Sequence, residues 1–475
     1  MDPHRKTIFL TVSVGMIARN LLHNDFWKTV TSKYNVVILT AFADDEVDAD
    51  FIKLFGRPNV VVEKMVIHRL SRVEKLFWSL HKALMYNPTT LLRARYGLTS
   101  VEAKQKKTIL KKIKNNLEYV LFGLALSKIH FLKDALKRID RFFYHTDYYK
   151  ELFDQYDPAA VFLTNISSDD ETYLLRSAKS RRVYTFGMTK SWDNFSKIGF
   201  RDKVDTLIVW SDFMKDEAVK FQNYPRERVH VIGIPQFDIY YNLRHRAKRE
   251  DFTSLYGLDP AKKTILFGDG GITLSPDDPY VIGVIRDWII ANQKPYQILV
   301  RPHYMWKGAY EHFASVEDKK VVFIDTFNKP SSFKRGGGWD ISPEHHYRLA
   351  LSMTFSDLVV TSISTLVLDG LACGNQVICY AFDKDKNLPY TESIKRLYTT
   401  LWFLDLQKYG LTKRMVASER ELLEKIEAVL DKGLRDFDEE AKHILSRFCY
   451  VIDGRTGQRL YSLLDTKITR MPHTG

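Results

Sequence analysis

Hydroxyl and carboxylate side chains gather in one short segment, DLVVTSISTLVLDGLACGNQVICYAF at residues 357–382. Its first apolar residues are typical of a buried parallel strand, and TLVLDGLACG is typical of a helix. The hydroxyls of Ser362, Ser364 and Thr365 are therefore expected at the carboxyl end of a strand, where open α/β sheets bind ligands. They could donate hydrogen bonds to phosphate oxygens, and Asp369 could accept hydrogen bonds from two ribose hydroxyls. Helix capping by serine is the alternative, but a charge in an apolar helix usually needs a partner, which favours a ligand.

A planar cation and an imidazole follow a second expected strand, in the segment ILVRPHY. Arg301 offers two parallel donors to a phosphate, and His303 can donate to a diphosphate oxygen or to a leaving group. Both could be ordinary loop residues, but the hydroxyl cluster is expected on a neighbouring strand, which favours one shared donor site. In FGDGG, residues 267–271, Gly270 could let backbone N–H groups approach a phosphate, and a plain turn explains the glycines equally well.

The first half of the chain offers candidates for an acceptor site and a general base. Gly15 follows the first expected strand and would allow close approach of a substrate, unless it only forms a tight turn. The segment SWDN supplies a ring for sugar stacking at Trp192, an amide at Asn194 and a carboxylate at Asp193. Asp193, or Asp170 in the segment NISSDDE, could deprotonate an acceptor hydroxyl. Helix capping explains the acids of NISSDDE more simply.

Alternating strand-like and helix-like segments predict the framework that positions these residues. The polar segment 242–263 interrupts the pattern, which then restarts. We therefore predict an α/β protein with two Rossmann-like (GT-B-like) domains: residues 1–242 for the acceptor and 243–475 for the nucleotide-sugar, with the last helix able to cross back. Strands are expected in the β-rich runs at residues 7–14, 35–42, 59–67, 159–165, 182–188, 206–211, 228–234, 264–271, 296–303, 321–327, 357–362 and 376–382.

Composition limits the kind of protein. The 475 residues are too many for one ordinary core, and 45% hydrophobic with 27% charged residues indicates a globular chain. The three cysteines are too few for a disulfide framework and suit a reducing compartment. A signal peptide would need a cleavage site where Arg19 and Asn20 stand. We therefore expect a cytoplasmic protein.

Residues 69–150 carry nearly all of the net charge of +13, with 18 Lys and Arg against 6 Asp and Glu. Leu, Phe and Lys recur there at helical spacing, which predicts a basic helical insertion in the first domain. Aromatic residues interleave with the charge, which suits peripheral contact with an anionic membrane, such as the inner face of the cell membrane. Solvated helices and nucleic-acid binding are the alternatives, but no known nucleic-acid motif accompanies the charge.

Two of these motifs resemble those of a known family. STLVLDGLACGNQVI resembles the nucleotide-binding segment of GT-B-fold glycosyltransferases, except that Asp369 replaces the usual Glu and Gln376 the usual Pro. RPH, residues 301–303, resembles the same element in bacterial surface-polysaccharide glycosyltransferases and in CDP-glycerol glycerophosphotransferases, both GT-B-like. The resemblance implies an enzyme of cell-envelope polysaccharide biosynthesis, a glycosyltransferase that moves a sugar from a nucleotide-sugar to a lipid-linked or surface-glycan acceptor. The residues of the two motifs would hold the donor.

Three other functions stay open. A CDP-glycerol-type glycerophosphotransferase tends to show Asp-Tyr-Ser-Ser where this chain has residues 362–365. A UDP-sugar 2-epimerase typically shows Ser-Gly-Gly followed by paired Glu residues, and this chain has neither. A non-catalytic GT-B-derived scaffold would bind nucleotide weakly or not at all. No metal or other cofactor is expected, because the acid pairs lack the Asp-x-Asp spacing and protein cations could neutralise a diphosphate.

Overall fold

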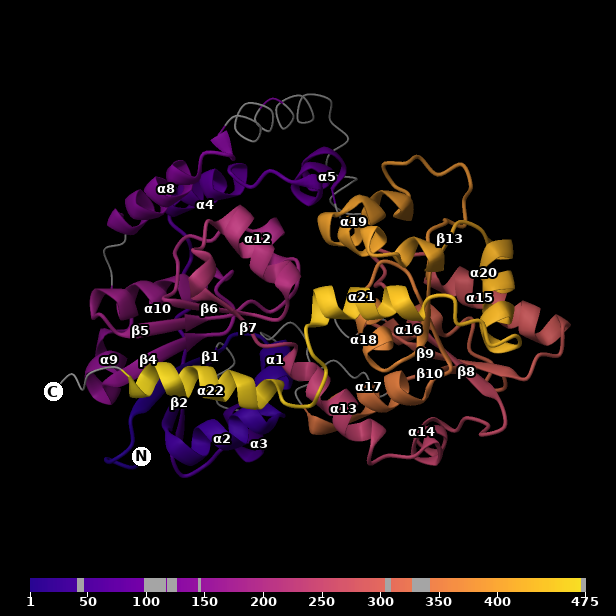
Figure 1. Cartoon of the computed structure of the whole chain (residues 1–475), viewed down its shortest axis with the longest axis horizontal. Coiled ribbons are helices and arrows are strands. Elements are labelled where there is room, and N and C mark those ends of the chain that lie inside the picture. Colours follow the sequence, from indigo (N-terminus) through magenta and orange to yellow (C-terminus); the bar gives the residue numbers. More distant parts are fainter. Residues whose placement is uncertain are drawn as a thin grey trace.

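Two parallel β-sheets, each with helices packed around it, make up the two halves of the protein (Figure 1). The structure is a computed structural model that describes residues 1–40, 47–97, 117, 126–143, 147–303, 309–326 and 342–470. The predicted α/β class with two Rossmann-like halves is confirmed. Both halves consist of β–α–β units, as the alternation in the sequence predicts.

In the described part of the first half, seven parallel strands pair in the order β3-β2-β1-β4-β5-β6-β7. The central strands are buried along their length because helices cover both faces of a parallel sheet. The strand order reverses between β1 and β4, so a crevice lies beyond their carboxyl ends. The strands are β1 (Thr7–Val12), β2 (Asn35–Thr40), β3 (Val60–Lys64), β4 (Pro158–Leu163), β5 (Tyr184–Gly187), β6 (Thr206–Val209) and β7 (Val229–Val231).

The helices that accompany this sheet in the described residues are short or amphipathic. They are α1 (Gly15–Ile17), the π-helix η1 (Ala18–Leu22), α2 (Asp25–Lys33), α3 (Val47–Phe55), α4 (Arg72–Ala83), α5 (Pro88–Tyr96), α8 (His130–Phe142), α9 (Lys150–Tyr156), α10 (Asp169–Ser180), α11 (Asn194–Lys197) and α12 (Asp212–Gln222).

The second half repeats the plan, with described strands in the order β10-β9-β8-β11-β12-β13. Its order reverses between β8 and β11, which again defines a crevice at the carboxyl ends of these strands. The strands are β8 (Lys263–Gly268), β9 (Tyr296–Arg301), β10 (Val322–Ile324), β11 (Leu358–Thr361), β12 (Gln376–Tyr380) and β13 (Met415–Val416). The described helices from residue 238 onward are α13 (Asp238–Arg244), α14 (Arg249–Tyr256), α15 (Asp278–Ala291), α16 (Ala309–Phe313), α17 (Pro343–Phe355), α18 (Leu366–Ala372), α19 (Leu401–Lys408), α20 (Glu419–Leu430) and α21 (Asp438–Cys449), followed by α22 (Thr456–Thr469).

The C-terminal helix α22 lies against the first half of the protein, beside α2 (Figure 1). The Lys33 ammonium lies 2.5 Å from the Asp465 carboxylate, and the Tyr34 hydroxyl donates to the same carboxylate over 2.6 Å. The predicted domain boundary at residue 242 falls within α13. Helix α13 begins directly after the 3₁₀ helix η4 (Pro235–Phe237). The chain therefore passes between the halves twice, through α13 and through the segment that joins α21 to α22.

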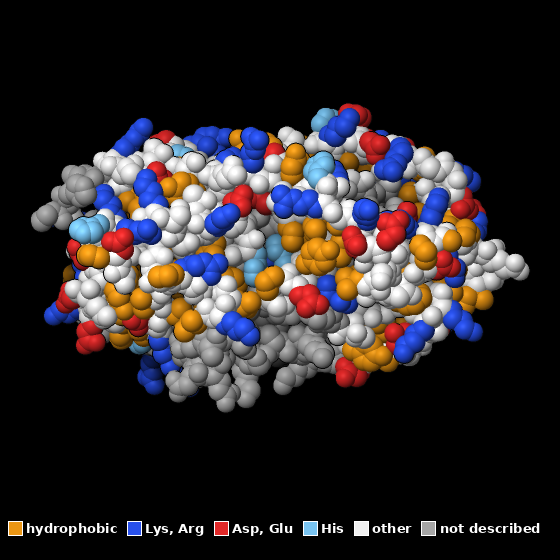
Figure 2. All heavy atoms as spheres, turned by 90° about the horizontal axis from the view of Figure 1, so that it is seen from below, with side chains coloured by type: hydrophobic (Ala, Val, Ile, Leu, Met, Phe, Trp, Pro, Cys, Tyr) orange, Lys and Arg blue, Asp and Glu red, His pale blue; other side chains and the backbone are white. Residues whose placement is uncertain are grey.

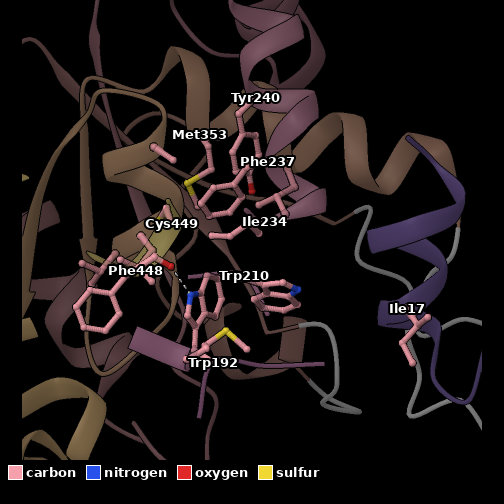
Figure 3. Close-up of a cluster of buried hydrophobic side chains, with 14 of the residues drawn as sticks. Ile17, Trp192, Trp210, Ile234, Phe237, Tyr240, Met353, Phe448 and Cys449 are labelled. Carbon is pink, nitrogen blue, oxygen red and sulfur yellow. Dashed lines mark hydrogen bonds between the residues drawn. The ribbon is translucent and has the colours of Figure 1, made fainter. Parts of the chain in front are cut away.

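An apolar cluster packs where the two halves meet (Figure 3). Trp192 from the first half donates its Nε1–H to the carbonyl oxygen of Phe448 in α21 over 2.9 Å, and its ring lies edge-on to Trp210 at 4.9 Å. The rings of Phe237 and Tyr240, on the crossing segment, lie tilted to each other with centroids 5.0 Å apart beside them. This cluster fixes the position of the crossing segment beside the crevices of both sheets.

Helices α4, α5 and α8 stand between β3 and β4 in the chain, where the sequence predicts a basic insertion. Helices α4 and α8 lie on the outside of the first half, above α10 and α12 in Figure 1, whereas α5 lies above α19 and contacts the 3₁₀ helix η5 (Ile394–Thr399) of the second half. None of the described helices is long and apolar enough to cross a bilayer. Residues 98–116, 118–125 and 144–146 of the predicted insertion lie outside the described residues.

Candidate functional site

A cavity of about 150 Å³ lies between the two halves, at the crevices of both sheets. Figure 2 shows histidine side chains near the middle of the lower face, between the halves. The first half contributes Met16, Arg19, Lys190, Ser191, Trp192, Trp210 and Gln236. The second half contributes Asp269, Arg301, Pro302, His303, His345, Leu349, Ser364, Thr365, Leu366 and Asp369.

The two donor motifs of the second half meet at this cavity. Arg301 ends β9, and Ser364 and Thr365 follow β11, two strands that both pair with β8. Because parallel strands end at the same edge of a sheet, motifs more than sixty residues apart face one space. His303 and Asp369 line the same space. The Ser364 hydroxyl accepts from the amide of Leu366, the first residue of α18, over 3.2 Å while it borders the cavity.

The guanidinium of Arg301 is held by a buried acid. Its Nη1 donates to Oδ2 of Asp325 over 2.7 Å, and Arg348 lies 3.3 Å from the other oxygen of the same carboxylate. Both Arg301 and Asp325 are buried. A buried ion pair that is also hydrogen-bonded fixes a side chain in one orientation, so Arg301 presents a preoriented positive charge to the cavity.

Asp269 ties the loop after β8 to the loop after β9. Its carboxylate accepts from the backbone amide of His303 over 2.8 Å and from the amide of Gly271 over 2.6 Å. Gly271 has φ +87°, a conformation that favours glycine. Burial lowers the pKa of His303, and the charge of Asp269 opposes that shift. The imidazole is therefore neutral at pH 7, the form that can accept a proton.

Asp369 faces the cavity from α18 and binds the crossing segment. The hydroxyl of Tyr240 in α13 donates to its carboxylate. Burial raises the pKa of Asp369 to about 6, although the Tyr240 hydrogen bond and the charges of Arg19 and Arg301 lower it. The carboxylate is thus ionised at pH 7 but close to its titration range. Its link to Tyr240 couples the cavity to the segment between the halves.

Cations from both halves surround these groups. Arg19, in η1 after β1, donates to the side-chain oxygen of Gln236 over 2.6 Å, and Lys190 follows β5. Burial and the nearby charges of Arg301 and Arg19 lower the pKa of His345 to about 2. Three positive side chains (Arg19, Lys190 and Arg301) thus line one small cavity, which suits an anionic ligand such as a diphosphate.

Two predicted donor residues lie beneath the cavity and do not line it. The amide of Gly270 donates to buried Asp278 over 2.9 Å, so this N–H already has a hydrogen-bond acceptor within the protein. A Cβ at Gly270 would stand 2.4 Å from the hydroxyl oxygen of Ser362, which explains the glycine by close packing. Ser362 is fully buried, and among the described residues its hydroxyl has no hydrogen-bond partner.

The predicted acceptor and base residues also differ in whether they line the cavity. Trp192 lines the cavity but is buried in the cluster of Figure 3, with its N–H bound to Phe448. Asn194 caps the turn before α11 by accepting from the Ser191 amide over 3.2 Å. Asp193 forms an ion pair with Lys197, and Asp170 stands in the first turn of α10. The structure places Asn194, Asp193, Asp170 and also Gly15 outside the cavity lining.

Several cavity residues escaped the sequence analysis. Asp269 stands inside the FGDGG segment, whose glycines are the stronger signal, and Arg19 follows the first strand by one turn of helix. Tyr240, which binds Asp369 from 129 residues away, gives no local signal. Of these residues, Arg19 could most readily be identified from the sequence, because a cation near the carboxyl end of a first Rossmann strand already fits an anion site.

The two-sheet fold, with a cavity between the crevices of its two halves, is of the GT-B type. Residues 177–465 match the model of the family described as CDP-Glycerol:Poly(glycerophosphate) glycerophosphotransferase. The match spans more than half of the chain, and the chain belongs to that family. A search of curated protein sequences finds no significant match.

Solved structures show the same fold at low sequence identity. A glycosyltransferase from Rickettsia africae is 11% identical with a TM-score of 0.50, covering 99% of this chain and 100% of its own. UDP-GlcNAc 2-epimerase from Neisseria meningitidis, bound to UDP-GlcNAc, is 10% identical with a TM-score of 0.50, covering 97% and 99%. The wall teichoic acid polymerase TagF is 14% identical with a TM-score of 0.47, covering 98% and 89%.

Proposed function

We propose that the protein transfers a glycerol-phosphate type unit from a CDP-linked donor to the growing end of a cell-surface polymer. The single observation that carries this proposal is the convergence of Arg19, Lys190 and Arg301 on the space lined by His303 and Asp369. The family supports CDP-glycerol as the donor over the nucleotide-sugar that the sequence analysis placed first. Both donors share a nucleoside diphosphate, so the donor-binding roles predicted for the second half apply to either.

In the proposed reaction, an acceptor hydroxyl attacks the phosphorus that carries the glycerol. His303 takes the hydroxyl proton, a new P–O bond forms to the acceptor, and the P–O bond to CMP breaks. Arg301, with Arg19 and Lys190, stabilises the negative charge that grows on the departing phosphate. Ser364 and Thr365 donate to donor oxygens, and the Asp369 carboxylate accepts from the ribose hydroxyls.

The acceptor is proposed to enter from the first half, beside Trp192 and Lys190. A cavity of about 150 Å³ is smaller than the ~300–1,000 Å³ of small-molecule sites. A complete donor therefore requires the halves to separate, and the crossing segment with Tyr240 is where that movement would occur. We further propose that the acceptor is lipid-linked and that the enzyme works at an anionic membrane surface.

A thermal-shift panel with CDP-glycerol, UDP, GDP and their sugar conjugates tests the donor. CDP-glycerol is expected to raise Tm selectively, because a ligand that binds only the native state stabilises it. Arg301→Ala is expected to weaken binding by about 10–100-fold, the loss of a charge-assisted phosphate contact. Arg348→Ala is the matched control, since it removes the other arginine bound to Asp325 but lines no part of the cavity. Selective stabilisation by a nucleotide-sugar would contradict the CDP-glycerol assignment.

Donor affinity is expected to fall as pH is lowered through about 6, the pKa of Asp369. The carboxylate accepts hydrogen bonds from ribose only when it is ionised, so protonation below its pKa removes an acceptor. The apparent Kd should rise by up to about tenfold per pH unit below the pKa. Donor titrations between pH 5.5 and 7.5 measure this change in the apparent Kd. Asp369→Asn should bind weakly and independently of pH, and an equal slope in that variant would assign the effect elsewhere.

Chelation by EDTA is expected to leave the transfer rate unchanged within about twofold, because protein cations neutralise the diphosphate in the proposed site. Initial rates before and after chelation, with Mg²⁺ restored as the control, measure it. A rate that EDTA abolishes and Mg²⁺ restores would contradict a metal-free site.

A further inference from the structure

Glu171 is a buried acid that the proposed reaction does not use. It stands in the first turn of α10 and is 0% exposed. Its Oε1 accepts from the Ser13 hydroxyl and its Oε2 accepts from the backbone amide of Asn165, both over 2.8 Å. Burial raises the pKa of Glu171 to about 7, although these two hydrogen bonds lower it. Because burying a carboxylate costs free energy, stability alone does not explain an acid at this position.

The two partners of Glu171 begin the loops on either side of the first-half crevice. Ser13 directly follows β1, and Asn165 comes two residues after the end of β4. The strand order reverses between these two strands, so both loops border the crevice. The Glu171 carboxylate therefore joins the two loops to each other and to α10.

The loop after β1 leads to one cation of the cavity. Only Val14 separates Ser13 from α1, which continues directly into η1, and η1 contains Arg19. The guanidinium of Arg19 lines the cavity and donates to the side-chain oxygen of Gln236 over 2.6 Å. Gln236 thus holds the tip of the Arg19 side chain, while the hydrogen bond from Ser13 to Glu171 holds the start of the helical segment that carries it.

The loop after β4 is connected to the other first-half cation of the cavity lining. The amide of Asn165 binds Glu171, and the next amide, that of Ile166, donates to the carbonyl oxygen of Met188 over 3.0 Å. Met188 directly follows β5 and stands two residues before Lys190, which lines the cavity. Glu171 therefore supports both segments that bring a positive side chain from the first half to the cavity.

We propose that Glu171 is a positioning residue that, through Ser13 and Asn165, holds Arg19 and Lys190 where they bind a diphosphate. Glu171 does not line the cavity, so it acts only through these two cations. Such support matters because a shift of about 1 Å in a functional site can cost about 100-fold in rate. This inference rests on the proposed function in one respect, that the cavity binds a diphosphate, and it does not depend on which donor or acceptor is used.

A double-mutant cycle on the full chain, with inorganic pyrophosphate as the probe, tests the proposal. Calorimetry at about pH 8, where Glu171 is mostly ionised, measures the Kd. Ser13→Ala removes the hydroxyl that binds Glu171 and is expected to weaken binding by about 3–10-fold. In the Arg19→Ala background the same change should alter the Kd by less than about 1.5-fold, because the cation that Ser13 supports is already absent. In the Lys190→Ala background it should keep its full effect, because Lys190 is connected through Asn165.

Two further variants separate positioning from stability. Ser177→Ala is the matched control, because Ser177 is also buried and donates to a carboxylate over 2.8 Å, that of Asp147, but stands in the last turn of α10. It should lower Tm about as much as Ser13→Ala while pyrophosphate binding stays within about twofold of the wild type. Glu171→Gln is the conservative variant and should bind within about threefold of the wild type. Its amide can donate to the Ser13 hydroxyl while its oxygen accepts from the Asn165 amide.

Three results would overturn the proposal. Ser13→Ala could bind pyrophosphate as tightly as the wild type does. Its effect could be equal in the wild-type and Arg19→Ala backgrounds, which would assign Ser13 to general stability. The wild type could fail to bind pyrophosphate, which would contradict the proposed function as well. Transfer from CDP-glycerol, measured on the same proteins, reports on the reaction separately: its absence with the expected cycle would contradict the proposed donor alone.

Discussion

His303→Gln is expected to lower kcat by about 10²–10⁴-fold while donor binding stays within about threefold. The imidazole lines the cavity beside Arg301, and Asp269 fixes its backbone by accepting from the His303 amide. Glutamine keeps the volume and a hydrogen-bonding group but cannot take a proton at neutral pH. The loss should therefore fall on the chemical step.

Steady-state kinetics and donor titration on the same preparations measure this split. The acid limb of the pH–rate profile should also disappear in His303→Gln, which a merely structural role would not cause. His312→Gln is the control, because burial lowers the pKa of His312 and the charge of Asp269 opposes that shift, as at His303, although His312 does not line the cavity. A kcat within about threefold of the wild type would exclude His303 as the base.

Asp140→Asn is expected to lower the free energy of unfolding of the first half by about 3–5 kcal/mol. Its carboxylate accepts two hydrogen bonds from Arg201, at 2.8 and 2.7 Å, and lies 3.0 Å from Arg176 and 3.2 Å from His81. The acid and both arginines are buried. Neutralising the acid leaves the two arginine charges without adequate compensation inside the protein.

Urea unfolding followed by fluorescence measures the change, with Asp134→Asn as the matched control. Asp134 stands on the same helix and pairs with Lys203, but it is 37% exposed, so its loss should cost no more than about 1 kcal/mol. Burial raises the pKa of Asp140, yet the hydrogen bonds from Arg201 and His81 hold it well below its usual range. The stabilisation is therefore present above the ordinary aspartate pKa and is lost as pH falls below it. Equal effects of the two variants would contradict the role of the buried cluster.

The loss of Asp140 should also weaken the attachment of α8 to α10, where Asp140 pairs with Arg176, while Lys133 and Lys137 still bind carbonyl groups of α12. Burial lowers the pKa of Lys137 to about 7, so this attachment depends on hydrogen bonding to a carbonyl as much as on charge.

The sequence by itself determined the strands and the edge at which ligands bind. Largely apolar runs such as residues 7–12 and 358–361 predict buried parallel strands, and each predicted strand matches an observed one within a few residues. Since polar residues that follow parallel strands reach a common edge, Arg301, His303 and Asp369 could be grouped in advance. Among the strands that the structure describes, only the two-residue strand β13 gives no signal, because so short a strand has no detectable period.

The tertiary structure alone decided which of those residues face the cavity and what holds them. The Tyr240–Asp369 and Arg301–Asp325 contacts join segments that lie far apart in the chain, and nothing local encodes them. It also decided the orientation of α8. Helical periodicity predicts that its lysines share one face, but which face turns inward depends on the carbonyl groups of α12 and on Arg176 and Arg201, which the chain supplies more than thirty residues later.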